Sequence, residues 1–551
     1  MRENTAARRK APFFFIALLT LLALVVAACG GSSGSKSSPD SGSSDEGKPQ
    51  YGGTITYSLE AKTTAFCPPA GQWAISAIMV ASALYDTLTR PTDDPDVFAP
   101  YLAKSVTGNA DNTEWTIVVR DGIKFHDGTP LDANAVKVNI DAWRKGILLN
   151  FVFKNIADVT VTAPDTVVVK TTTPWVDFPA FLYTTGRAAI AAPTQILATD
   201  CDTKLIGTGP FKLKPGGFDP TSGDIAVVKN TDYWRKGLPY LDGINFKPQE
   251  ESASRITGLQ SGDIDITHSS GGKDLNKIKS VAPSATIVLE PDGRMEIAHT
   301  LINVTRPPLN DIDARRAVAL AVDRDRLNQL FNEGTSRLTD QVFDTDVTGY
   351  LPNLKYPKQN IAEAKKLIAK VKAKNGGKFE FAIQSVFDQS VQDLVKEVKR
   401  QLDAVGITVN LPKPVDQATL ISLAITGQVD SFAWRNYPGQ DPDLLYVWFY
   451  GGSIVNFNHI ADPVIDKALD DGRTTSDPAV RKKAYETFNK RMTNQLYNFW
   501  TWYNQWFVAS QPNIHGVVGP NLPDENGKTG SVKPVPMLAG IHQTVGLWKS
   551  K

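Results

Sequence analysis

Two kinds of hydrophobic pattern follow one another along the first half of the chain. Residues 53–57 alternate between apolar and polar side chains after a glycine, and residues 115–120 form a β-branched run, so both are predicted to be strands. Two further β-rich runs lie within 159–169 and are separated by a Pro-Asp pair, which predicts a hairpin. Between these strands, residues 131–144 carry apolar side chains at helical spacing and are predicted to form a helix.

The second half of the chain alternates helices with short strands. Helical spacing of apolar residues predicts three helices, over 311–331, 361–374 and 391–405. Each of the last two is followed by a β-rich run, at 379–386 and 407–411, and Gly406 stands where a helix C-cap is expected. Such alternation indicates an α/β fold. Two α/β lobes would leave a cleft between them, which is where ligands usually bind.

The first 28 residues have the pattern of a signal peptide. A basic stretch containing Arg8, Arg9 and Lys10 precedes an uncharged apolar run over 12–28, which ends in small residues before Cys29. The run Val-Ala-Ala-Cys resembles the lipobox of bacterial lipoproteins, in which the peptide is cut before a lipidated cysteine. We therefore expect lipidation at Cys29. The alternative is an uncleaved transmembrane helix, for which the run is marginal because a span needs about 20 apolar residues.

Composition then narrows the class of protein. Residues 30–50 are rich in Gly and Ser and are expected to form a flexible tether, whereas 51–551 is too long for a single core. The chain is 42% hydrophobic and 21% charged, as in ordinary globular proteins. Its formal net charge of +1 and the lack of a basic stripe argue against a nucleic-acid partner.

Cysteine and histidine are sparse. Apart from Cys29 the chain contains Cys67 and Cys201, which in an oxidising compartment form a disulfide or stay two separate buried thiols; both alternatives remain open. The six histidines show no zinc-binding spacing, so no metal and no cofactor is expected. No nucleophile elbow or P-loop motif occurs, which leaves hydrolysis and nucleotide binding without support.

A series of short motifs carries a family resemblance. The segment 119–130, in which an Arg-Asp-Gly run leads to Phe-His-Asp-Gly, closely matches a family signature, and further motifs follow in family order at 207–211, 230–234, 241–244, 259–265, 307–311 and 441–443. Over residues 51–510 the chain resembles the bacterial extracellular solute-binding proteins of family 5, the oligopeptide-, dipeptide- and nickel-binding group.

The resemblance implies an α/β fold with two lobes, the large cluster-C form of the type II periplasmic-binding-protein fold, with an extra subdomain in the first lobe. The expected organisation is a signal peptide at 1–28, the lipidated cysteine and tether at 29–50, the first lobe at 51–300 with its subdomain at about 85–205, the second lobe at 301–500, and a return to the first lobe at 501–551.

The function implied by the resemblance is that of a receptor, not an enzyme. The protein would act as a monomer anchored by lipid at the outer face of the cytoplasmic membrane, in the periplasmic space. It would capture a peptide by closing its lobes about a hinge near residues 300 and 500, and deliver it to ABC permease subunits that work with separate ATPases.

Two polar motifs are given structural roles. His126 and Asp127 look like a catalytic pair, but adjacent residues on a strand point to opposite faces, so a turn with local hydrogen bonds is the favoured interpretation. Arg315 and Arg316 are expected on a helix surface or in interlobe ion pairs.

The ligand site is expected around residues 431–449. In peptide-binding relatives an Asp shortly after the Trp of this segment holds the α-amino group of the ligand as an ion pair. Here the matching Trp434 is followed by Arg435, Asn436 and Tyr437, and the next acids are Asp441 and Asp443. The amine anchor is therefore missing. Arg435 and Asn436 suit a carboxylate or a hydroxyl-rich ligand instead.

Aromatic residues supply further candidates. Trp500 and Trp502 alternate on a predicted strand and would share one face, while Tyr503 would point to the other. Trp502, Tyr503 and, in the first lobe, Trp73 are expected to contact ligand, because aromatic rings stack on sugars as well as on peptide side chains. A peptide is the first expected ligand, with an oligosaccharide or a nickel chelate as alternatives. A sensor or chaperone module and a secreted hydrolase are the alternatives from other classes.

Overall fold

The computed structural model describes residues 47–551, except 70–72, 93–97, 147–148, 294, 438–440, 520, 529, 531 and 535–536. The described residues belong to one compact unit, Asp45–Lys551. The signal peptide, Cys29 and most of the tether predicted above lie outside the described residues. Within the described part, no helix is long and apolar enough to cross a membrane.

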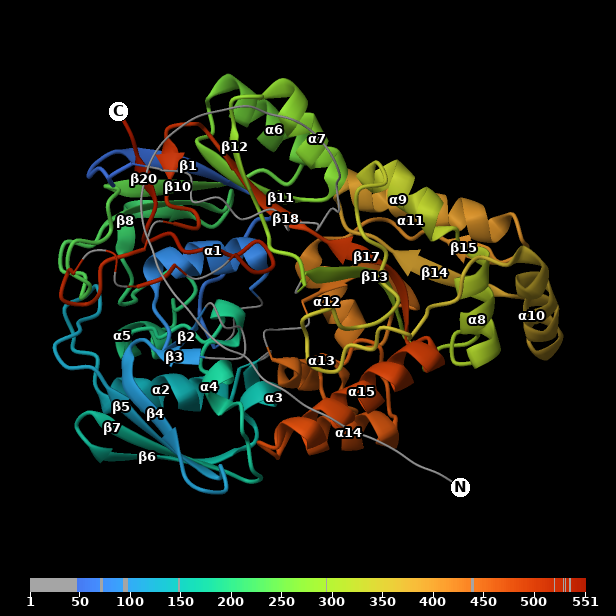
Figure 1. Cartoon of the computed structure of the whole chain (residues 1–551), viewed down its shortest axis with the longest axis horizontal. Helices are drawn as coiled ribbons and strands as arrows, with labels where there is room; N and C mark the ends of the chain where they lie inside the picture. The colour runs from blue at the N-terminus through green and yellow to red at the C-terminus, as the bar shows by residue number, and fades with distance from the viewer. Residues whose placement is uncertain are drawn as a thin grey trace, which may run out of the picture. The chain divides into compact units, whose positions relative to one another are not determined.

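The largest sheet has seven strands and draws them from both ends of the unit (Figure 1). Its order is β12 (Thr286–Leu289), β18 (Trp506–Ser510), β11 (Ile266–Ser270), β1 (Thr54–Leu59), β10 (Gly243–Pro248), β9 (Asp224–Lys229) and β8 (Phe211–Asp219). β1 runs parallel to β10 and β11, and the other pairs are antiparallel. The strand expected at 53–57 is β1. Most of its residues are buried because it lies in the middle of this sheet.

A second sheet has five strands and is built from the later part of the chain. Its order is β15 (Thr408–Asn410), β14 (Glu380–Gln384), β16 (Ser431–Asn436), β13 (Glu296–Ile302) and β17 (Asn498–Asn504). Helices α8 (Ile312–Ala321), α10 (Ile361–Lys374) and α11 (Gln389–Asp403) contribute apolar residues to a core with β14, β15 and β17. These helices and strands confirm the α/β alternation read from the sequence.

The region predicted as a single helix, 311–331, forms two helices in the structure. Residues 311–331 form α8 and α9 (Arg324–Asn332), because Val322 takes an extended conformation and the Asp323 side chain caps the second helix by accepting from the backbone N–H of Arg326. An Asp inside a helical pattern is a start signal as well as a polar residue. The prediction of one continuous helix was therefore wrong at this point.

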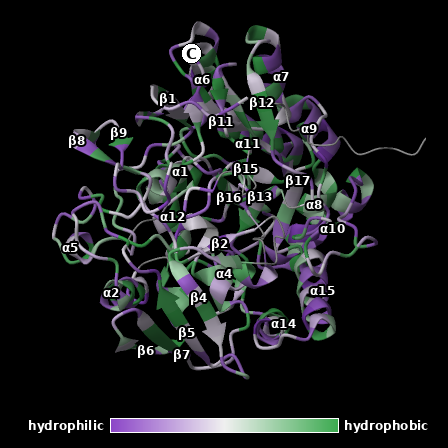
Figure 2. Ribbon diagram, turned by 60° about the vertical axis from the view of Figure 1, so that its left-hand side comes forward, coloured by the Kyte–Doolittle hydropathy of each residue, from purple (hydrophilic) through white to green (hydrophobic). Residues whose placement is uncertain are grey.

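A four-stranded antiparallel sheet forms a further layer with its own core. It contains β4 (Ala103–Gly108), β5 (Glu114–Val119), β7 (Thr166–Thr171) and β6 (Ile156–Ala163), and helix α2 (Ala133–Trp143) contacts β6 and β7. The predicted strand at 115–120, the helix at 131–144 and the hairpin at 159–169 are all confirmed here. Figure 2 shows that β5 and β7 are largely apolar, in contrast to the more polar α15 (Pro478–Gln495).

The remaining elements are short or cover the sheets. Helices α1 (Ile75–Leu84), α6 (Ser252–Ser261) and α7 (Gly272–Val281) accompany the large sheet, and α12 (Gln417–Ile425), α13 (Tyr446–Phe449) and α14 (Pro463–Arg473) accompany the five-stranded one. Two small ladders pair β2 (Thr89–Pro91) with β3 (Phe98–Pro100) and β19 (Ile514–His515) with β20 (Trp548–Lys549). Single helical turns complete the set: α3 (Leu149–Phe153), α4 (Phe178–Phe181) and α5 (Pro193–Ile196).

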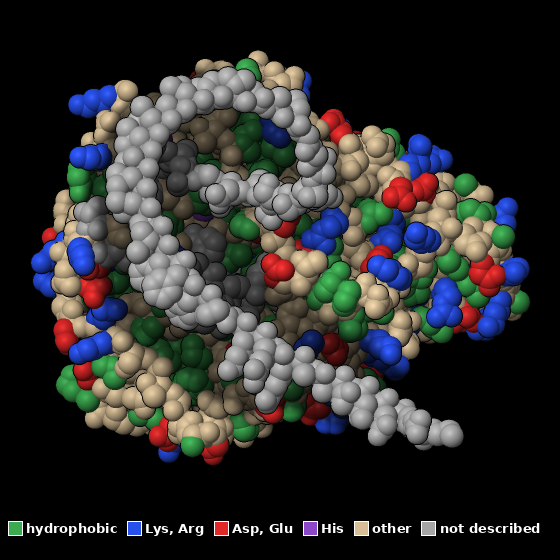
Figure 3. Space-filling model, in the orientation of Figure 1, with side chains coloured by type: hydrophobic (Ala, Val, Ile, Leu, Met, Phe, Trp, Pro, Cys, Tyr) green, Lys and Arg blue, Asp and Glu red, His purple; other side chains and the backbone are tan. Residues whose placement is uncertain are grey.

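Charged side chains are mixed over the visible surface. Figure 3 shows acidic and basic groups interspersed over the region of α8, α10 and α11, in keeping with the formal net charge of +1. On the face that the figure shows, the two signs of charge are therefore mixed rather than separated.

Candidate functional site

The chain passes between the two large sheets at two neighbouring places. It leaves the seven-stranded sheet after β12 and enters the five-stranded sheet at β13, and it returns from β17 to β18 with Gln505 as the single intervening residue. Two buried carboxylates tie these crossings together. Glu290 accepts from the backbone N–H of Trp506 at 3.2 Å, and Glu296 accepts from the indole N–H of the same Trp at 2.8 Å.

Arg435 links the two sheets directly at this junction. It lies near the end of β16 and its guanidinium is 3.1 Å from Glu60, which follows β1, and 3.7 Å from Glu296. It also donates to the Ser270 hydroxyl at 3.2 Å and stacks over the Trp506 ring, 4.8 Å from its centroid. One arginine therefore contacts residues from four strands or strand ends, belonging to both sheets.

The carboxylates around Arg435 are in different electrostatic states. Burial is the largest influence on Glu60 and raises its pKa, but the combined effect of Arg435, His268 and Arg255 outweighs burial and holds that pKa below its ordinary value. For Glu296 burial outweighs the same arginine, so its pKa is raised. Glu60 is therefore the carboxylate in this group that is held in its charged form, and it can pair with a cation.

A second arginine, Arg187, lies within the electrostatic range of Glu296 and forms no ion pair with a described carboxylate. Its Nε donates to the backbone oxygen of Trp73 at 3.0 Å, and no carboxylate of the described residues lies within ion-pair distance of it. Burial lowers its pKa to about 10, although the negative charge of Glu296 acts in the opposite direction. We call Glu60, Arg187, Glu296 and Arg435 the junction cluster. It carries a cation with unused hydrogen-bond donors.

The neighbours of Arg435 on β16 divide between solvent and core. Trp434 and Tyr437 are partly exposed, like Arg435 itself, whereas Asn436 is buried and its Oδ1 lies 2.8 Å from His299 Nε2. The Trp434 ring stands at right angles to Phe432 and Phe457, with centroids 5.5 Å and 5.7 Å away. Of the four consecutive residues predicted to bind ligand, three are partly exposed and therefore accessible. The fourth, Asn436, is buried and hydrogen-bonded to a buried histidine.

The Asp-Pro-Asp turn is engaged by protein groups. Asp441 accepts from Arg481 at 2.6 Å, and the same guanidinium contacts Asp177. Asp443 accepts from Arg473 at 2.8 Å and from the indole N–H of Trp175 at 3.1 Å. We call these six residues the aspartate junction. It joins the four-stranded-sheet region to the segment after β16, so the structure places Asp441 in a buried ion-pair network.

The aromatic candidates are buried in separate cores. Trp502 is 6% exposed, and Tyr503 is 3% exposed with its hydroxyl donating to the backbone oxygen of Phe343. The expectation that Trp500 and Trp502 share a face was wrong: the register between β13 and β17 shifts after Ala298, and the two rings lie in different cores. Such a bulge adds one residue and so breaks the two-residue alternation.

Trp73, the candidate from the first half, is 2% exposed and packs against Phe66 and Tyr85. Its contribution to the junction cluster is the backbone oxygen that receives Arg187. The sequence-based prediction was that the Trp73 ring contacts ligand, so the hydrogen bond between Arg187 and the Trp73 backbone was not predicted.

The structural roles given to two polar motifs have different outcomes. The turn is confirmed, since Asp127 accepts from the backbone N–H and the hydroxyl of Thr129. The expectation for Arg315 was wrong: it is 4% exposed and donates to the backbone oxygens of Gln495 and Leu309 rather than to a carboxylate. Backbone carbonyls satisfied a cation for which a charged partner was expected.

Of the two alternatives for the cysteines, the structure contains the disulfide. Cys67 and Cys201 are joined, with their Cα atoms 5.0 Å apart, and the bond closes a loop of 134 residues. It lies within the part of the chain that forms the seven- and four-stranded sheets.

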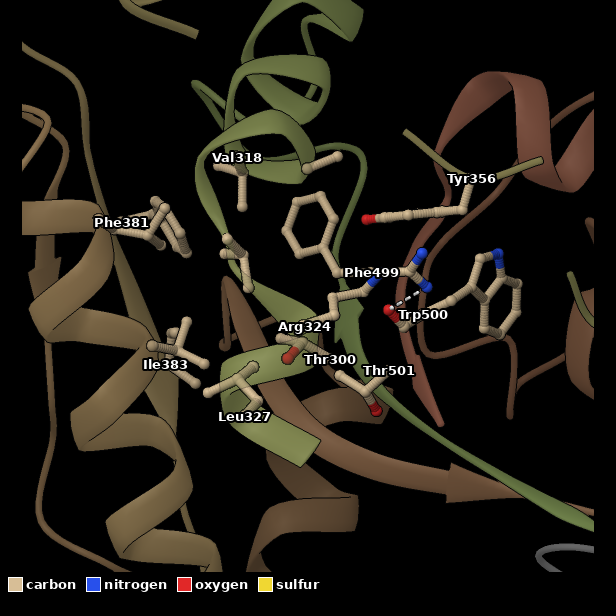
Figure 4. A pocket seen from close by; sticks show the side chains of 14 residues that line it. Thr300, Val318, Arg324, Leu327, Tyr356, Phe381, Ile383, Phe499, Trp500 and Thr501 are labelled. Carbon is tan, nitrogen blue, oxygen red and sulfur yellow. Dashed lines mark hydrogen bonds between the residues drawn. The ribbon is translucent and has the colours of Figure 1, made fainter. Parts of the chain in front are cut away.

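A small apolar pocket lies inside the core of the five-stranded sheet, away from the junction cluster. Figure 4 shows Val318, Phe381 and Ile383 around it, and Arg324 bonded to the backbone oxygen of Trp500. Its volume is about 20 Å³, which is room for about one water molecule. It is too small for a peptide or a sugar.

Sequence reasoning missed three of the four residues of the junction cluster. Glu60, Arg187 and Glu296 belong to no motif, and they lie far from Arg435 along the chain. The available signal was a charged residue directly at the end or start of a strand, which is where Glu60 and Glu296 stand. Among the described residues no group of three or more potential ligands is arranged to hold a metal ion.

Comparison with known proteins agrees with this architecture. The solved structure of AgaA from A. tumefacien R10 in complex with agropinic acid superposes with a TM-score of 0.80 at 24% identity, covering 91% of this chain and 99% of that one. The oligopeptide-binding protein AppA from Bacillus subtilis, in complex with a nonapeptide, gives 0.78 at 21% identity and covers 92% and 100%. These likenesses confirm the type II periplasmic-binding-protein fold.

Sequence comparison gives the family. The glutathione-binding protein GsiB of Escherichia coli (strain K12) is 25% identical over 402 residues, which cover 70% of this chain and 76% of that protein. The profile of the bacterial extracellular solute-binding proteins, family 5, matches residues 97–457. The chain therefore belongs to the bacterial extracellular solute-binding proteins of family 5.

Proposed function

We propose that this protein is the receptor of an ABC importer for short peptides or other amino-acid-derived solutes that carry a free carboxylate, and that Arg187 receives this carboxylate. The observation that carries the proposal is the Arg187 guanidinium, which lies within the electrostatic range of Glu296 and pairs with no described carboxylate, whereas Arg435 is ion-paired. A guanidinium presents donors in a planar fork that fits a carboxylate, and a desolvated cation gains most from such a partner.

The same cluster offers a place for an ammonium group. No acid follows Trp434 at the position where peptide-binding relatives carry one, but Glu60 approaches β16 from the other sheet. Against the opposing effect of burial, Arg435, His268 and Arg255 together keep the pKa of Glu60 below its ordinary value, which favours the charged carboxylate. A zwitterionic ligand would place its ammonium at Glu60 and its carboxylate at Arg187.

The named ligands of the similar proteins support a carboxylate. Glutathione, a nonapeptide and agropinic acid are all carboxylic acids. An oligosaccharide has less support, because Trp502, Tyr503 and Trp73, the rings that would stack on a sugar, are buried among protein groups. A nickel chelate is bound by the similar NikZ of Campylobacter jejuni, yet no observation in this chain favours it.

Capture would proceed by closure of two lobes built on the two large sheets. The two crossings between the sheets, at 290–295 and Gln505, are adjacent and would form the hinge. The lobes expected at 51–300 (with a subdomain at about 85–205 and the return at 501–551) and at 301–500 would meet at these crossings. As members of the five-stranded sheet, β13 and β17 would belong wholly to the second lobe. A ligand bound at the junction cluster would stabilise the closed state because it contacts both lobes.

The remaining parts of the proposal concern location and partners. Lipidation at Cys29 after removal of 1–28, and a tether up to residue 50, would hold a monomeric receptor at the membrane surface. Membrane permease subunits with separate ATPases would accept the closed form. The protein itself would perform no chemical step.

Calorimetric titration of the purified protein with a set of matched dipeptides tests the ligand class. A dipeptide with both termini free should bind, its C-terminal amide should bind at least tenfold more weakly, and Arg187→Gln should abolish the difference between the two. Losing a buried charged hydrogen bond typically costs 2–5 kcal/mol in binding. Arg400→Gln, on the exposed surface of α11, is the matched control and should bind like the wild type.

Equal affinity for the free acid and the amide would contradict the role of Arg187. Binding of oligosaccharides without any binding of peptides would overturn the whole ligand class, and the family membership would then stand with a different solute.

A further inference from the structure

A cavity separate from the junction cluster lies on the side of the seven-stranded sheet. Its walls come from α1, the chain from Tyr85 through β2, residues 183–189, Tyr233 with Arg235, and the C-terminal segment 541–545. Figure 1 shows that C-terminal segment beside α1. Its described walls include no residue of the five-stranded sheet, so the cavity does not depend on the approach of the two large sheets.

The one carboxylate in this cavity is fully engaged. Asp86 is 5% exposed and accepts three hydrogen bonds, from the hydroxyls of Thr208 and Tyr233 and from the indole of Trp234, at 3.0–3.1 Å. Burial raises its pKa in spite of these donors. Three neutral donors fill most of its acceptor sites, and it has no ion pair with an arginine among the described residues.

Two arginines line the same cavity. Arg235 is 3% exposed and donates to the backbone oxygen of Pro523 at 2.6 Å, with the Tyr101 hydroxyl at 3.5 Å. Arg90 is partly exposed and lies 5.7 Å from the centroid of the Tyr101 ring. Arg90 has no hydrogen-bond acceptor and no carboxylate partner among the described residues, and burial lowers its pKa.

A partly desolvated guanidinium with five unused donors is stabilised by any anion that reaches it. With both arginines charged, Asp86 can neutralise only one of them, so the cavity has an excess of positive charge. The wall also contains tyrosine and small side chains, among them Tyr101, Tyr183 and Ser82, together with neutral polar groups such as Gln543 and Thr544. Such a site accepts one negative charge and a short apolar body.

The volume of the cavity limits the size of this body. It is about 100 Å³, which is below the roughly 150 Å³ of an engineered protein cavity that holds benzene. The space therefore suits a molecule of a few heavy atoms. We propose that this cavity is a binding site for a short-chain monocarboxylate, whose carboxylate lies on Arg90 and whose alkyl end contacts the tyrosine-lined wall.

The site is distinct from the one proposed for the transported solute. It is lined by Tyr183 and Gly186, close in sequence to Arg187, but Arg187 itself is not among its walls. Occupancy of this cavity would therefore require Arg90 and not Arg187. This separation gives the proposal its sharpest test.

Titration of the purified protein with propionate, followed by ligand-observed NMR and calorimetry, tests the site, with propionamide as the uncharged isostere. Propionate should bind, and propionamide should bind at least tenfold more weakly. Arg90→Gln should weaken propionate binding at least tenfold. Arg120→Gln is the matched control, because Arg120 lies against Trp234 of the same region but pairs with Glu525 and does not line the cavity.

Two further variants decide between this cavity and the junction cluster. Ser82→Leu fills the cavity from a partly exposed position without changing its charge, and it should abolish propionate binding. Arg187→Gln should leave propionate binding unchanged. The proposal is overturned if the wild type does not bind propionate, if propionamide binds equally well, or if binding is lost in Arg187→Gln and kept in Arg90→Gln.

Discussion

The junction cluster and the aspartate junction both connect distant parts of the chain through arginine and carboxylate groups, yet they differ in completeness. At the aspartate junction the Arg473 and Asp443 side chains are 5% and 0% exposed, and the indole N–H of Trp175 donates a further hydrogen bond to Asp443. At the junction cluster the Arg435 side chain is 36% exposed, and Arg187 has no ion pair with any residue that the structure describes.

The difference fits a structural role for the aspartate junction and the binding role proposed for the junction cluster. A buried carboxylate satisfied by an arginine and an indole has no capacity left for a ligand, so the Asp-Pro-Asp turn is expected to hold the protein together. A partly solvated ion pair can still form contacts with a ligand, because ligand groups can replace its water and side-chain contacts at a modest cost in free energy.

Breaking the aspartate junction should give the largest effect. Arg473→Gln leaves Asp443 buried without its charged partner, and removing one member of a buried pair costs about 3–5 kcal/mol. Urea denaturation should show this loss in the free energy of unfolding. Lys467→Gln, which breaks the exposed pair with Asp471, is the control and should cost less than about 0.5 kcal/mol. If both variants lost a similar free energy of unfolding, the buried and the exposed ion pair would contribute equally, which would contradict this prediction.

The crossing between the two sheets should respond to pH with an intermediate effect. Burial raises the pKa of Glu290 well above its ordinary value of 4.5. A carboxyl whose pKa is raised on folding contributes stability that is full below the unfolded pKa and is lost as pH rises through the folded one. The free energy of unfolding should therefore fall by up to about 1.4 kcal/mol per pH unit from this group above pH 4.5.

Glu290→Gln isolates this contribution, because glutamine does not ionise. Denaturation from pH 4.5 to 8 should show the wild type losing stability relative to the variant as pH rises. A difference between the two proteins that stays constant over this range would contradict the assignment.

The smallest effect is expected at the junction cluster itself. A double-mutant cycle with Glu60→Gln and Arg435→Gln should give a coupling of about 0.5–1 kcal/mol in the stability of the ligand-free protein, because the arginine is partly solvated. A coupling as large as the loss in Arg473→Gln would show that the cluster is a structural junction like the other one, and that ligand contacts lie elsewhere.

Most of the secondary structure was predictable from the sequence because it is encoded locally. The helix at Ile361–Lys374 has the predicted bounds, and the predicted hairpin is β6 with β7. The errors occurred where one residue changed the local rule: Asp323 began a new helix, and a bulge in the pairing of β17 sent Trp500 and Trp502 into different cores. The capping signal was in the sequence, whereas the bulge is a property of the pairing of two strands.

The sequence by itself determined the family, the α/β alternation and Arg435 as the charged residue in place of the amine anchor. The tertiary structure was needed to show that Glu60 and Glu296 meet Arg435, and that Arg187 lies in the range of Glu296 without an ion pair to a described residue. It was also needed to show that Asp441 and Asp443 pair with Arg481 and Arg473. The physical reason is the distance along the chain over which each interaction acts. Helical periodicity and capping act over a few residues, whereas the charge state and availability of a side chain depend on groups that the fold brings together from several hundred residues away.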